Sequence, residues 1–250
     1  MSWPNCAIAG SSVAEPDAAA DVAFVAGATG FVGRAVVAEL RRRGWTAVAH
    51  VRPDSRELAK WQAHFAAIGA SLSTAAWQPD ALTEALADTR ASHVFCCIGT
   101  TQTRMGRDGK LANSYEAVDF ALSRMLATCC AGRPTVRRLV YLSSLGAAKN
   151  AASPYLRWRW LAEQAVIESG VQYTIARPSL IVGLRDEPRP LERVSSRVMD
   201  GALAVAAVLG GGRVRDRYRS TDDVTLAAAL VRSATDASAI KQIVLSEALR

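Results

Sequence analysis

The sequence lacks a long hydrophobic run, and aromatic residues make up only 6% of it. Its most apolar later stretch, residues 202–209, is far shorter than the roughly 20 residues that a transmembrane helix needs. No positive segment followed by an apolar one opens the chain. Residues 1–20 are small, punctuated by proline and poorly patterned, so we expect them to form a loose N-terminal segment. These absences predict a protein without a membrane partner.

Cysteine and histidine are scarce, and their spacing does not suit the common metal sites. The chain has five cysteines, and four of them form the adjacent pairs Cys96-Cys97 and Cys129-Cys130, unlike the spaced pairs of a zinc site. The three histidines also lack metal spacing, and no Gly-x-Ser-x-Gly elbow of a hydrolase occurs. We therefore predict reduced, buried thiols and a cytoplasmic location.

Positive charge exceeds negative charge, with a formal net charge of +7. The basic residues cluster in residues 41–43, 185–197 and 213–219. Such clusters can bind nucleic acid, but here they are scattered and no nucleic-acid motif accompanies them. We interpret them as a solvated surface with anion sites for a cofactor and a small-molecule substrate, and we expect a monomer or homodimer.

Strand-like and helix-like segments alternate along the chain. The expected strands are residues 22–26, 46–51, 71–76, 93–98, 138–142, 171–176 and 242–245. The expected helices are residues 32–43, 56–68, 81–87, 114–130, 155–169, 194–209 and 223–234. This alternation predicts an α/β protein with a Rossmann-like doubly wound parallel sheet. We assign residues 21–178 to the dinucleotide-binding core and residues 179–250 to a small C-terminal substrate-side region packed on it.

A glycine-rich segment, Gly27-Ala28-Thr29-Gly30-Phe31-Val32-Gly33, follows the first expected strand and opens the first expected helix. In such a segment the first glycine permits a tight turn, the second lets a pyrophosphate approach the backbone, and the third lets helix and strand pack closely. The helix N-terminus then offers N–H groups and a positive dipole end to the phosphates. The predicted pyrophosphate-binding residues are Gly27, Thr29, Gly30, Phe31, Val32 and Gly33. A packing turn without a ligand is the alternative.

The end of the second strand favours NADP over NAD. An acid about 20 residues beyond the glycines would bind the ribose 2′-hydroxyl of NAD, but residues 49–53 contain no acid. Arg52 is placed to meet a 2′-phosphate, and Arg56 is placed to assist. Asp54 is the evidence against this interpretation, unless it begins the next helix.

Four segments together resemble a known family. They are residues 27–33, residues 95–101, residues 141–147 and residues 163–178. With these segments the chain resembles the extended and atypical short-chain dehydrogenase/reductases, in particular the NAD(P)H-binding branch that contains the Tat-interacting oxidoreductase-like proteins. The resemblance implies a Rossmann fold, a nicotinamide cofactor and an oxidoreductase activity.

The resemblance also implies roles for single residues. Arg52 matches the residue that contacts the 2′-phosphate, and Gly99 and Thr100 match the strand end beside the cofactor ribose. A second group matches the catalytic side of the family's site. Ser144, or less readily Ser143, matches the serine that orients a substrate carbonyl. Tyr155 matches the catalytic tyrosine. Pro178 and Ser179 match the stretch near the nicotinamide.

One departure from the family's pattern bears on catalysis. The family's Tyr-x-x-x-Lys is here Tyr155-Leu156-Arg157-Trp158-Arg159, with Arg159 in place of the lysine. A tyrosine with an ordinary pKa near 10 needs a nearby cation to act near neutral pH. Arg159 keeps that charge one helical turn away, but arginine does not replace lysine conservatively at a tight site.

A second departure is the missing acid after the third strand, where many relatives hold the adenine; Trp77 stands close by and is a candidate to stack on it. Asp119, in the long expected helix, is interpreted as a capping or packing residue without chemistry.

Two functions fit these residues. The first is an NADPH-dependent reductase of a small carbonyl or related substrate, with Tyr155 as proton donor, Ser144 as carbonyl orienter and Arg159 as electrostatic helper. The second is a non-catalytic NADP(H)-binding sensor or regulatory protein that uses the same pocket. A nucleic-acid-binding or protein-binding regulator is a third, weaker candidate.

Overall fold

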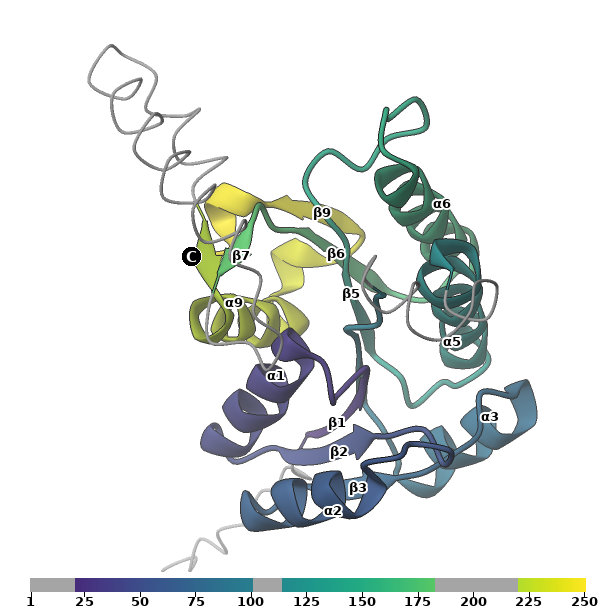
Figure 1. Ribbon diagram of the computed structural model, residues 1–250, viewed down its shortest axis with the longest axis vertical. Helices are drawn as coiled ribbons and strands as arrows, with labels where there is room; N and C mark the ends of the chain where they lie inside the picture. Colours follow the sequence, from purple (N-terminus) through teal and green to yellow (C-terminus); the bar gives the residue numbers. More distant parts are fainter. Residues whose placement is uncertain (1–20, 101–113, 183–219) are drawn as a thin grey trace, which may run out of the picture.

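The chain folds around a seven-stranded sheet in which all strands are parallel (Figure 1). The computed structural model describes residues 21–100, 114–182 and 220–250. In spatial order the strands are β3 (Ser71–Ser73), β2 (Thr46–His50), β1 (Val22–Ala26), β4 (His93–Cys96), β5 (Arg138–Leu142), β6 (Tyr173–Arg177) and β9 (Gln242–Leu245). Six of them follow the 3-2-1-4-5-6 order of a dinucleotide-binding Rossmann fold, which confirms the predicted fold class.

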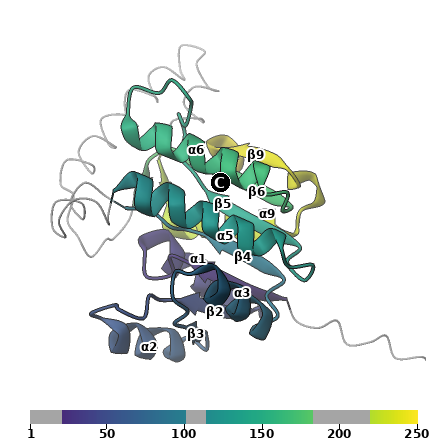
Figure 2. The same cartoon turned by 90° about the vertical axis from the view of Figure 1, so that its right-hand side faces the viewer.

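Helices cover both faces of this sheet (Figures 1 and 2). One face is covered by α1 (Phe31–Arg42), α2 (Leu58–Ala67) and α9 (Asp223–Thr235). The other face is covered by α3 (Pro79–Asp88), the π-helical segment η1 (Tyr115–Ala121), α5 (Leu122–Ala131) and α6 (Pro154–Glu168). The remaining described elements are the 3-10 turns η2 (Ala237–Ala239) and η3 (Ser246–Ala248) and a two-stranded parallel sheet of β7 (Ile181–Val182) and β8 (Thr221–Asp222).

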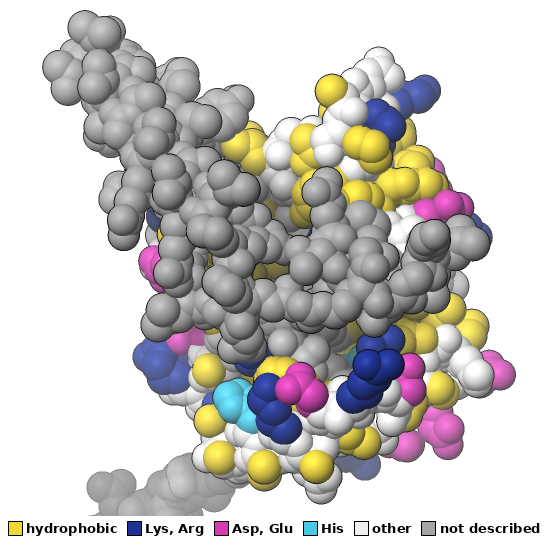
Figure 3. All heavy atoms as spheres, viewed as in Figure 1, with side chains coloured by type: hydrophobic (Ala, Val, Ile, Leu, Met, Phe, Trp, Pro, Cys, Tyr) yellow, Lys and Arg dark blue, Asp and Glu magenta, His cyan; other side chains and the backbone are white. Residues whose placement is uncertain are grey.

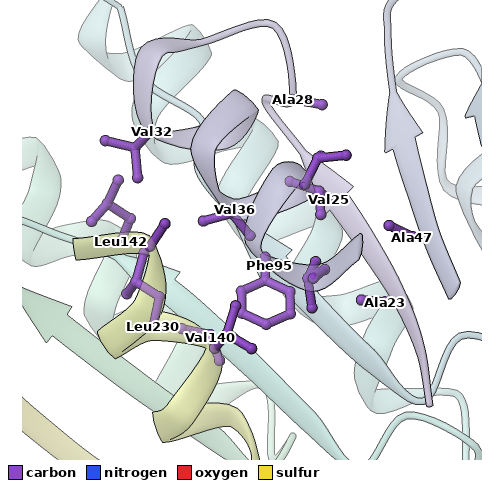
Figure 4. Close-up of a cluster of buried hydrophobic side chains, with 14 of the residues drawn as sticks. Ala23, Val25, Ala28, Val32, Val36, Ala47, Phe95, Val140, Leu142 and Leu230 are labelled. Atoms are coloured by element: carbon purple, nitrogen blue, oxygen red, sulfur yellow. The ribbon is translucent and has the colours of Figure 1, made fainter. Parts of the chain in front are cut away.

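The period-two geometry of a strand divides the core into two clusters. Ala23 and Val25 of β1 point into the cluster beneath α1 and α9, while Phe24 and Ala26 point into the opposite cluster. Figure 4 shows the first cluster, in which Phe95 of β4 and Leu230 of α9 lie beside Val36 of α1. Because both faces of the sheet are buried, its central strands consist of apolar runs without alternating polar residues.

The predicted elements agree with the structure for the strands 22–26, 138–142 and 242–245, and the others differ mainly at their ends. The expected strand 93–98 ends at Cys96. The amide of Cys97 still donates to the carbonyl of Ala26, but β1 ends there and turns at Gly27, so the regular strand pairing stops. The expected strand 71–76 ends at Ser73 for the same reason, because β2 turns away after Val51.

The long helix expected over residues 114–130 is two segments. Its first part is the π-helical η1, and the α-helical part α5 begins only at Leu122. The short strands β7 and β8 were not expected from the sequence. The N-terminal segment 1–20, the expected helix 194–209 and the basic stretches 185–197 and 213–219 lie outside the described residues.

The described part of the C-terminal region contributes to the same sheet. β9 pairs with β6 as the edge strand, and α9 lies against α1 (Figure 1). Arg138 at the start of β5 is buried and donates hydrogen bonds to the Thr174 hydroxyl and to the carbonyls of Ser233 and Asp236. This guanidinium therefore joins the end of α9 to the middle of the sheet.

Two further expectations concern cysteine and the membrane. The cysteines at positions 96, 97, 129 and 130 are all free, and only Cys97 is half-buried while the others are buried. Among the described residues, no helix combines the length and apolar character that crossing a bilayer requires.

Candidate functional site

The predicted phosphate loop connects β1 to α1 at the carboxyl edge of the sheet. Gly27 has a φ of +79°, and a Cβ built on it would lie 2.6 Å from the carbonyl oxygen of Cys97. A Cβ on Gly33 would lie 2.2 Å from the carbonyl oxygen of Gly27. Both distances are far inside van der Waals contact, so the turn and the helix can approach this closely only with glycine at both positions. The amide of Gly30 donates to the Gly27 carbonyl at 2.9 Å and closes the turn.

Among the described residues, no side chain caps the N-terminus of α1, and its first turn contains no acidic residue. The positive dipole end of such a helix attracts an anion placed against the loop. The side chain of Val32 is buried in the core and that of Phe31 packs against it, so both residues would contact a phosphate through their amides. Thr29 lies in the turn between the two glycines. A narrow glycine cradle beside an uncapped helix end suits a dinucleotide diphosphate.

Arg52 and Arg56 follow the end of β2, which is the neighbour of β1 in the sheet. The Arg52 side chain is 58% exposed, and its Nε lies 3.8 Å from Asp54. An exposed pair of this kind contributes little and leaves the guanidinium able to exchange partners. Figure 3 shows Lys and Arg side chains next to Asp and Glu side chains on this face, below the region drawn in grey.

His50 is the last residue of β2 and is buried. Its Nε2 lies 2.8 Å from the carbonyl oxygen of Ala75, and its ring meets the Trp77 ring edge-on at 5.0 Å. Burial lowers the pKa of His50, opposed by the Ala75 contact, so the imidazole is neutral at pH 7. Trp77 thus packs against the end of β2, where the sequence analysis proposed adenine stacking.

Gly99 and Thr100 follow β4, on the other side of the loop from Arg52. The amide of Thr100 donates to Oδ2 of Asp119 at 3.0 Å. A Cβ built on Gly99 would lie 2.4 Å from Nη2 of Arg159, so the guanidinium lies directly against the backbone here. The predicted ribose-side turn and the predicted catalytic helix are therefore in contact.

Arg159 is 5% exposed and is bonded through every nitrogen of its guanidinium. Its Nε donates to the hydroxyl oxygen of Tyr155 at 3.2 Å, and its Nη1 donates to the Tyr141 hydroxyl at 3.2 Å and to the Leu142 carbonyl at 2.9 Å. Its Nη2 forms an ion pair with Oδ1 of Asp119 at 3.0 Å. Burial works against the charged form of Arg159, but Tyr155, Tyr141 and Asp119 outweigh it and raise the pKa.

Tyr155 is half-buried in the first turn of α6, directly after Pro154 at the helix start. The Arg159 Cζ atom lies 5.3 Å from the centre of its ring, and the ring of Tyr115 from η1 packs against it at 5.3 Å. The phenol therefore has a cation on one side and an aromatic neighbour on the other. The predicted contact between Tyr155 and the charge one turn later is present.

The two adjacent serines after β5 have different surroundings. Ser143 is buried, and its hydroxyl donates to Oε1 of Glu163. Glu163 is itself held by Arg177, whose Nε donates to Oε1 at 2.8 Å, and this hydrogen bond raises the pKa of Arg177. Ser144 is half-buried, and within the described part of the chain its hydroxyl makes only a long contact of 3.4 Å with the Leu145 carbonyl. Of the two hydroxyls, that of Ser144 is the one able to turn to a ligand.

Pro178 follows β6, and its carbonyl oxygen accepts a hydrogen bond from the Leu145 amide at 2.8 Å. All predicted site residues thus follow β1, β2, β4, β5 and β6 at one edge of the sheet or stand at the start of α6. Their order along that edge is Arg52, the glycine loop, Gly99, Ser144 and Pro178, which follows from the strand order. This edge includes the topological switch between β1 and β4, where ligands bind in open α/β sheets.

Three buried groups that hold this site were not predicted from the sequence: Asp119, Tyr141 and Glu163. Asp119 is completely buried and pairs with Arg159, so it is a packing residue as expected, but its charged partner was not predicted. A signal was present, because an acid inside a helix with apolar neighbours must be paired. Its partner could not be identified from the sequence, because η1 and α6 meet only in the folded chain.

Comparisons with known proteins identify the family and the fold. Residues 27–197 match the sequence profile of a family described as NAD(P)H-binding. Protein TIC 62, chloroplastic, from Arabidopsis thaliana is 29% identical over 216 residues, covering 78% of this chain and 31% of the relative. The subunit 9 of the NADH dehydrogenase [ubiquinone] 1 alpha subcomplex, mitochondrial, from the same plant is 28% identical over 218 residues, covering 86% of this chain and 50% of the relative.

A solved structure shares the fold. The Bordetella bronchiseptica enzyme WbmG, solved in complex with NAD, superimposes with a TM-score of 0.59 at 14% identity, covering 89% of this chain and 71% of that chain. At this identity the likeness concerns the fold alone. The chain also spans only 31% and 50% of the two plant relatives, so their whole activities do not transfer to it.

Proposed function

The chain belongs to the NAD(P)H-binding family, among the atypical short-chain dehydrogenase/reductases, and on that premise we propose that it is an NADP(H)-dependent oxidoreductase. Its substrate in this proposal is a small carbonyl compound or a related unsaturated molecule. The location we propose is the cytoplasm, because a reducing compartment suits the four described free cysteines.

The observation that carries the proposal is the contact between Tyr155 and Arg159 at the loop-bearing edge of the sheet. Nε of Arg159 donates to the Tyr155 hydroxyl oxygen at 3.2 Å, so the phenol proton points elsewhere and is available to a ligand. A bound nicotinamide supplies the hydride. Tyr155 would then give its proton to the carbonyl oxygen, Ser144 would orient that oxygen, and Arg159 would stabilise the remaining phenolate.

The preference for NADP rests on the two arginines after β2. Arg52 and Arg56 are both exposed beside the phosphate loop, and β2 ends in a buried histidine where an NAD-binding protein would have an acid. A guanidinium binds a phosphate monoester with two parallel hydrogen bonds. Asp54 competes for Arg52 only through an exposed contact of 3.8 Å.

A second candidate function is a non-catalytic NADP(H)-binding sensor or regulatory protein. The observation that favours it is the inward bonding of Arg159. All three of its nitrogens contact protein groups. Arg159 therefore has fewer N–H groups left for the hydroxyls of a cofactor ribose than a free lysine ammonium would have.

The test combines cofactor titration with a reductase assay. NADPH and NADH are titrated calorimetrically into the full chain, and NADPH oxidation is followed with a panel of aldehydes, ketones and enones. We expect tighter binding of NADPH, and we expect Tyr155→Phe to lower kcat at least about 100-fold with the NADPH Kd unchanged. Tyr173→Phe is the matched control, since Tyr173 begins β6 at the opposite edge of the sheet.

Each outcome decides between the candidates. Equal turnover by wild type and Tyr155→Phe would reject Tyr155 as the proton donor. Tight NADPH binding without turnover of any compound would favour the sensor. No heat with either dinucleotide would reject both functions.

A further inference from the structure

Asp119 is a completely buried carboxylate whose bonds all lie within the candidate site. Its Oδ2 accepts the hydrogen bond from the Thr100 amide at 3.0 Å. Its Oδ1 is buried too, and its partner among the described residues is the guanidinium charge of Arg159, 3.0 Å from Nη2 but without an aligned N–H. The carboxylate thus contacts both the turn beside the phosphate loop and the cation beside the proton donor.

Arg159 cannot move away from this carboxylate without breaking other contacts. The backbone of Gly99 lies against Nη2, and the Tyr141 hydroxyl and Leu142 carbonyl hold Nη1 from β5. The guanidinium is therefore fixed with Nε toward Tyr155 and Nη2 toward Asp119. The two opposite charges of Arg159 and Asp119 are therefore both buried close to the phenol.

We infer that Asp119 is a positioning residue that fixes Arg159 and offsets most of the positive charge that this guanidinium presents to Tyr155. The inference rests on the proposed function for its relevance to turnover, but its physical content does not depend on it. A bare buried cation would stabilise a phenolate strongly, because the local dielectric constant is low. With its counter-ion in place the pair is neutral overall, and the phenol of Tyr155 faces a weaker positive potential.

The other ionisable groups that face this region do not take over this role. On β4 and β5, burial raises the pKa of Cys96, Cys97 and Tyr141, so these groups are neutral at pH 7. On α6, Glu163 is already neutralised by Arg177 of β6. The facing groups on η1 are the phenol of Tyr115 and the exposed Glu116, and Arg157 of α6 is exposed as well.

The test measures the pKa of Tyr155 directly, without turnover. The full chain is labelled at the tyrosine Cζ with ¹³C and titrated by NMR, and the Tyr155 signal is assigned by its loss in Tyr155→Phe. In Asp119→Asn the amide keeps the shape and an acceptor oxygen for Thr100, but removes the charge. We expect the pKa of Tyr155 to fall by about one unit or more, since a cation then lacks its counter-ion.

Glu163→Gln is the matched control. It neutralises an equally buried carboxylate of α6 that is already paired with Arg177, so the Tyr155 pKa should stay within about 0.3 units of wild type. An unchanged or raised Tyr155 pKa in Asp119→Asn would overturn the inference, as would an equal shift in both variants.

A second pair of variants covers the case in which Asp119→Asn does not fold. Arg159→Gln is compared with the double variant Asp119→Asn/Arg159→Gln, which replaces the ion pair by two neutral amides. We expect a higher free energy of unfolding for the double variant than for Arg159→Gln, because Arg159→Gln alone leaves a buried carboxylate without its counter-ion; equal free energies would overturn the inference.

Turnover gives the last comparison. If the protein reduces a carbonyl, the pH profile of kcat in Asp119→Asn should shift to lower pH by the same amount as the Tyr155 signal. A shifted signal without turnover in any variant would uphold the inference and reject the proposed function. Turnover with an unchanged Tyr155 signal would uphold the proposed function and reject the inference.

Discussion

At the scale of single residues, Arg159 shows how size and shape determine the role of a cation. Its planar guanidinium reaches Tyr155 with one nitrogen, the β5 oxygens with a second and Asp119 with a third. A lysine has one ammonium nitrogen at the end of a flexible stem and cannot make these three contacts together. Arg159 therefore holds the parts of the site together and also supplies its positive charge.

This leads to a prediction for Arg159→Lys, the change that matches the family's usual pattern. We expect it to lower the free energy of unfolding by about 2 kcal/mol, because Asp119 or the β5 oxygens lose a buried partner. Urea unfolding followed by circular dichroism measures the loss. Arg157→Lys is the control, since Arg157 is exposed and bonds only to nearby carbonyls. Equal free energies of unfolding for Arg159→Lys and wild type would show that one ammonium group is enough to satisfy Asp119 and the β5 oxygens.

At the scale of elements, the turn between β1 and α1 separates two uses of glycine. Gly33 faces the protein, where a Cβ would lie 2.2 Å from the Gly27 carbonyl oxygen and 2.9 Å from the Ala28 Cα. At Gly30 the nearest atom to a Cβ is that same oxygen at 3.1 Å. The protein fold thus requires glycine at position 33, while the proposed diphosphate gives the reason for glycine at position 30.

Two alanine variants test this distinction. Gly33→Ala should lower the free energy of unfolding by about 2 kcal/mol or more, because backbone atoms must shift to admit the methyl group. Gly30→Ala should cost less than about 1 kcal/mol yet weaken NADPH binding at least about tenfold. Thermal unfolding and calorimetric titration give the two quantities. Unchanged NADPH affinity in a folded Gly30→Ala protein would contradict the placement of the diphosphate.

At the scale of the whole molecule, the C-terminal part completes the fold. α9 packs beside α1 over the first core cluster, and β9 extends the sheet that carries the candidate site (Figures 1 and 4). Leu230 of α9 is fully buried in that cluster, next to Phe95 and Val140 in the view of Figure 4. Stability of the nucleotide-binding sheet therefore depends on residues that come well after β1 to β6 in the sequence.

Truncation of one side chain measures this dependence. Leu230→Ala should lower the free energy of unfolding by about 3 kcal/mol, since a buried leucine leaves a cavity. The control is Val224→Ala on the same helix, where the side chain is 66% exposed and the change should stay within about 0.5 kcal/mol. Chemical denaturation monitored by tryptophan fluorescence checks both. A small loss in Leu230→Ala would mean that α9 docks independently of the sheet.

Much of the fold was predictable because it is encoded over short distances in the chain. The glycine spacing, the apolar runs of β1 and β5 and the helix ends predicted at residues 43 and 169 depend on backbone sterics and local periodicity. The ends of β3 and β4 were predicted too late, since a strand ends where its neighbour turns away, and the neighbour comes from elsewhere in the sequence.

The amino-acid sequence by itself determined the strand–glycine loop–helix unit, the order of strands and helices and the spacing of Tyr155 and Arg159 on one helix face. These follow from interactions between residues within a few positions of one another. Only the tertiary structure decided that Asp119 pairs with Arg159. It also decided that the Ser143 hydroxyl donates to Glu163, so that the Ser144 hydroxyl is the one left for a ligand. Such pairs form when η1, β5 and α6 pack, because a buried charge or hydroxyl must find its partner wherever packing brings one.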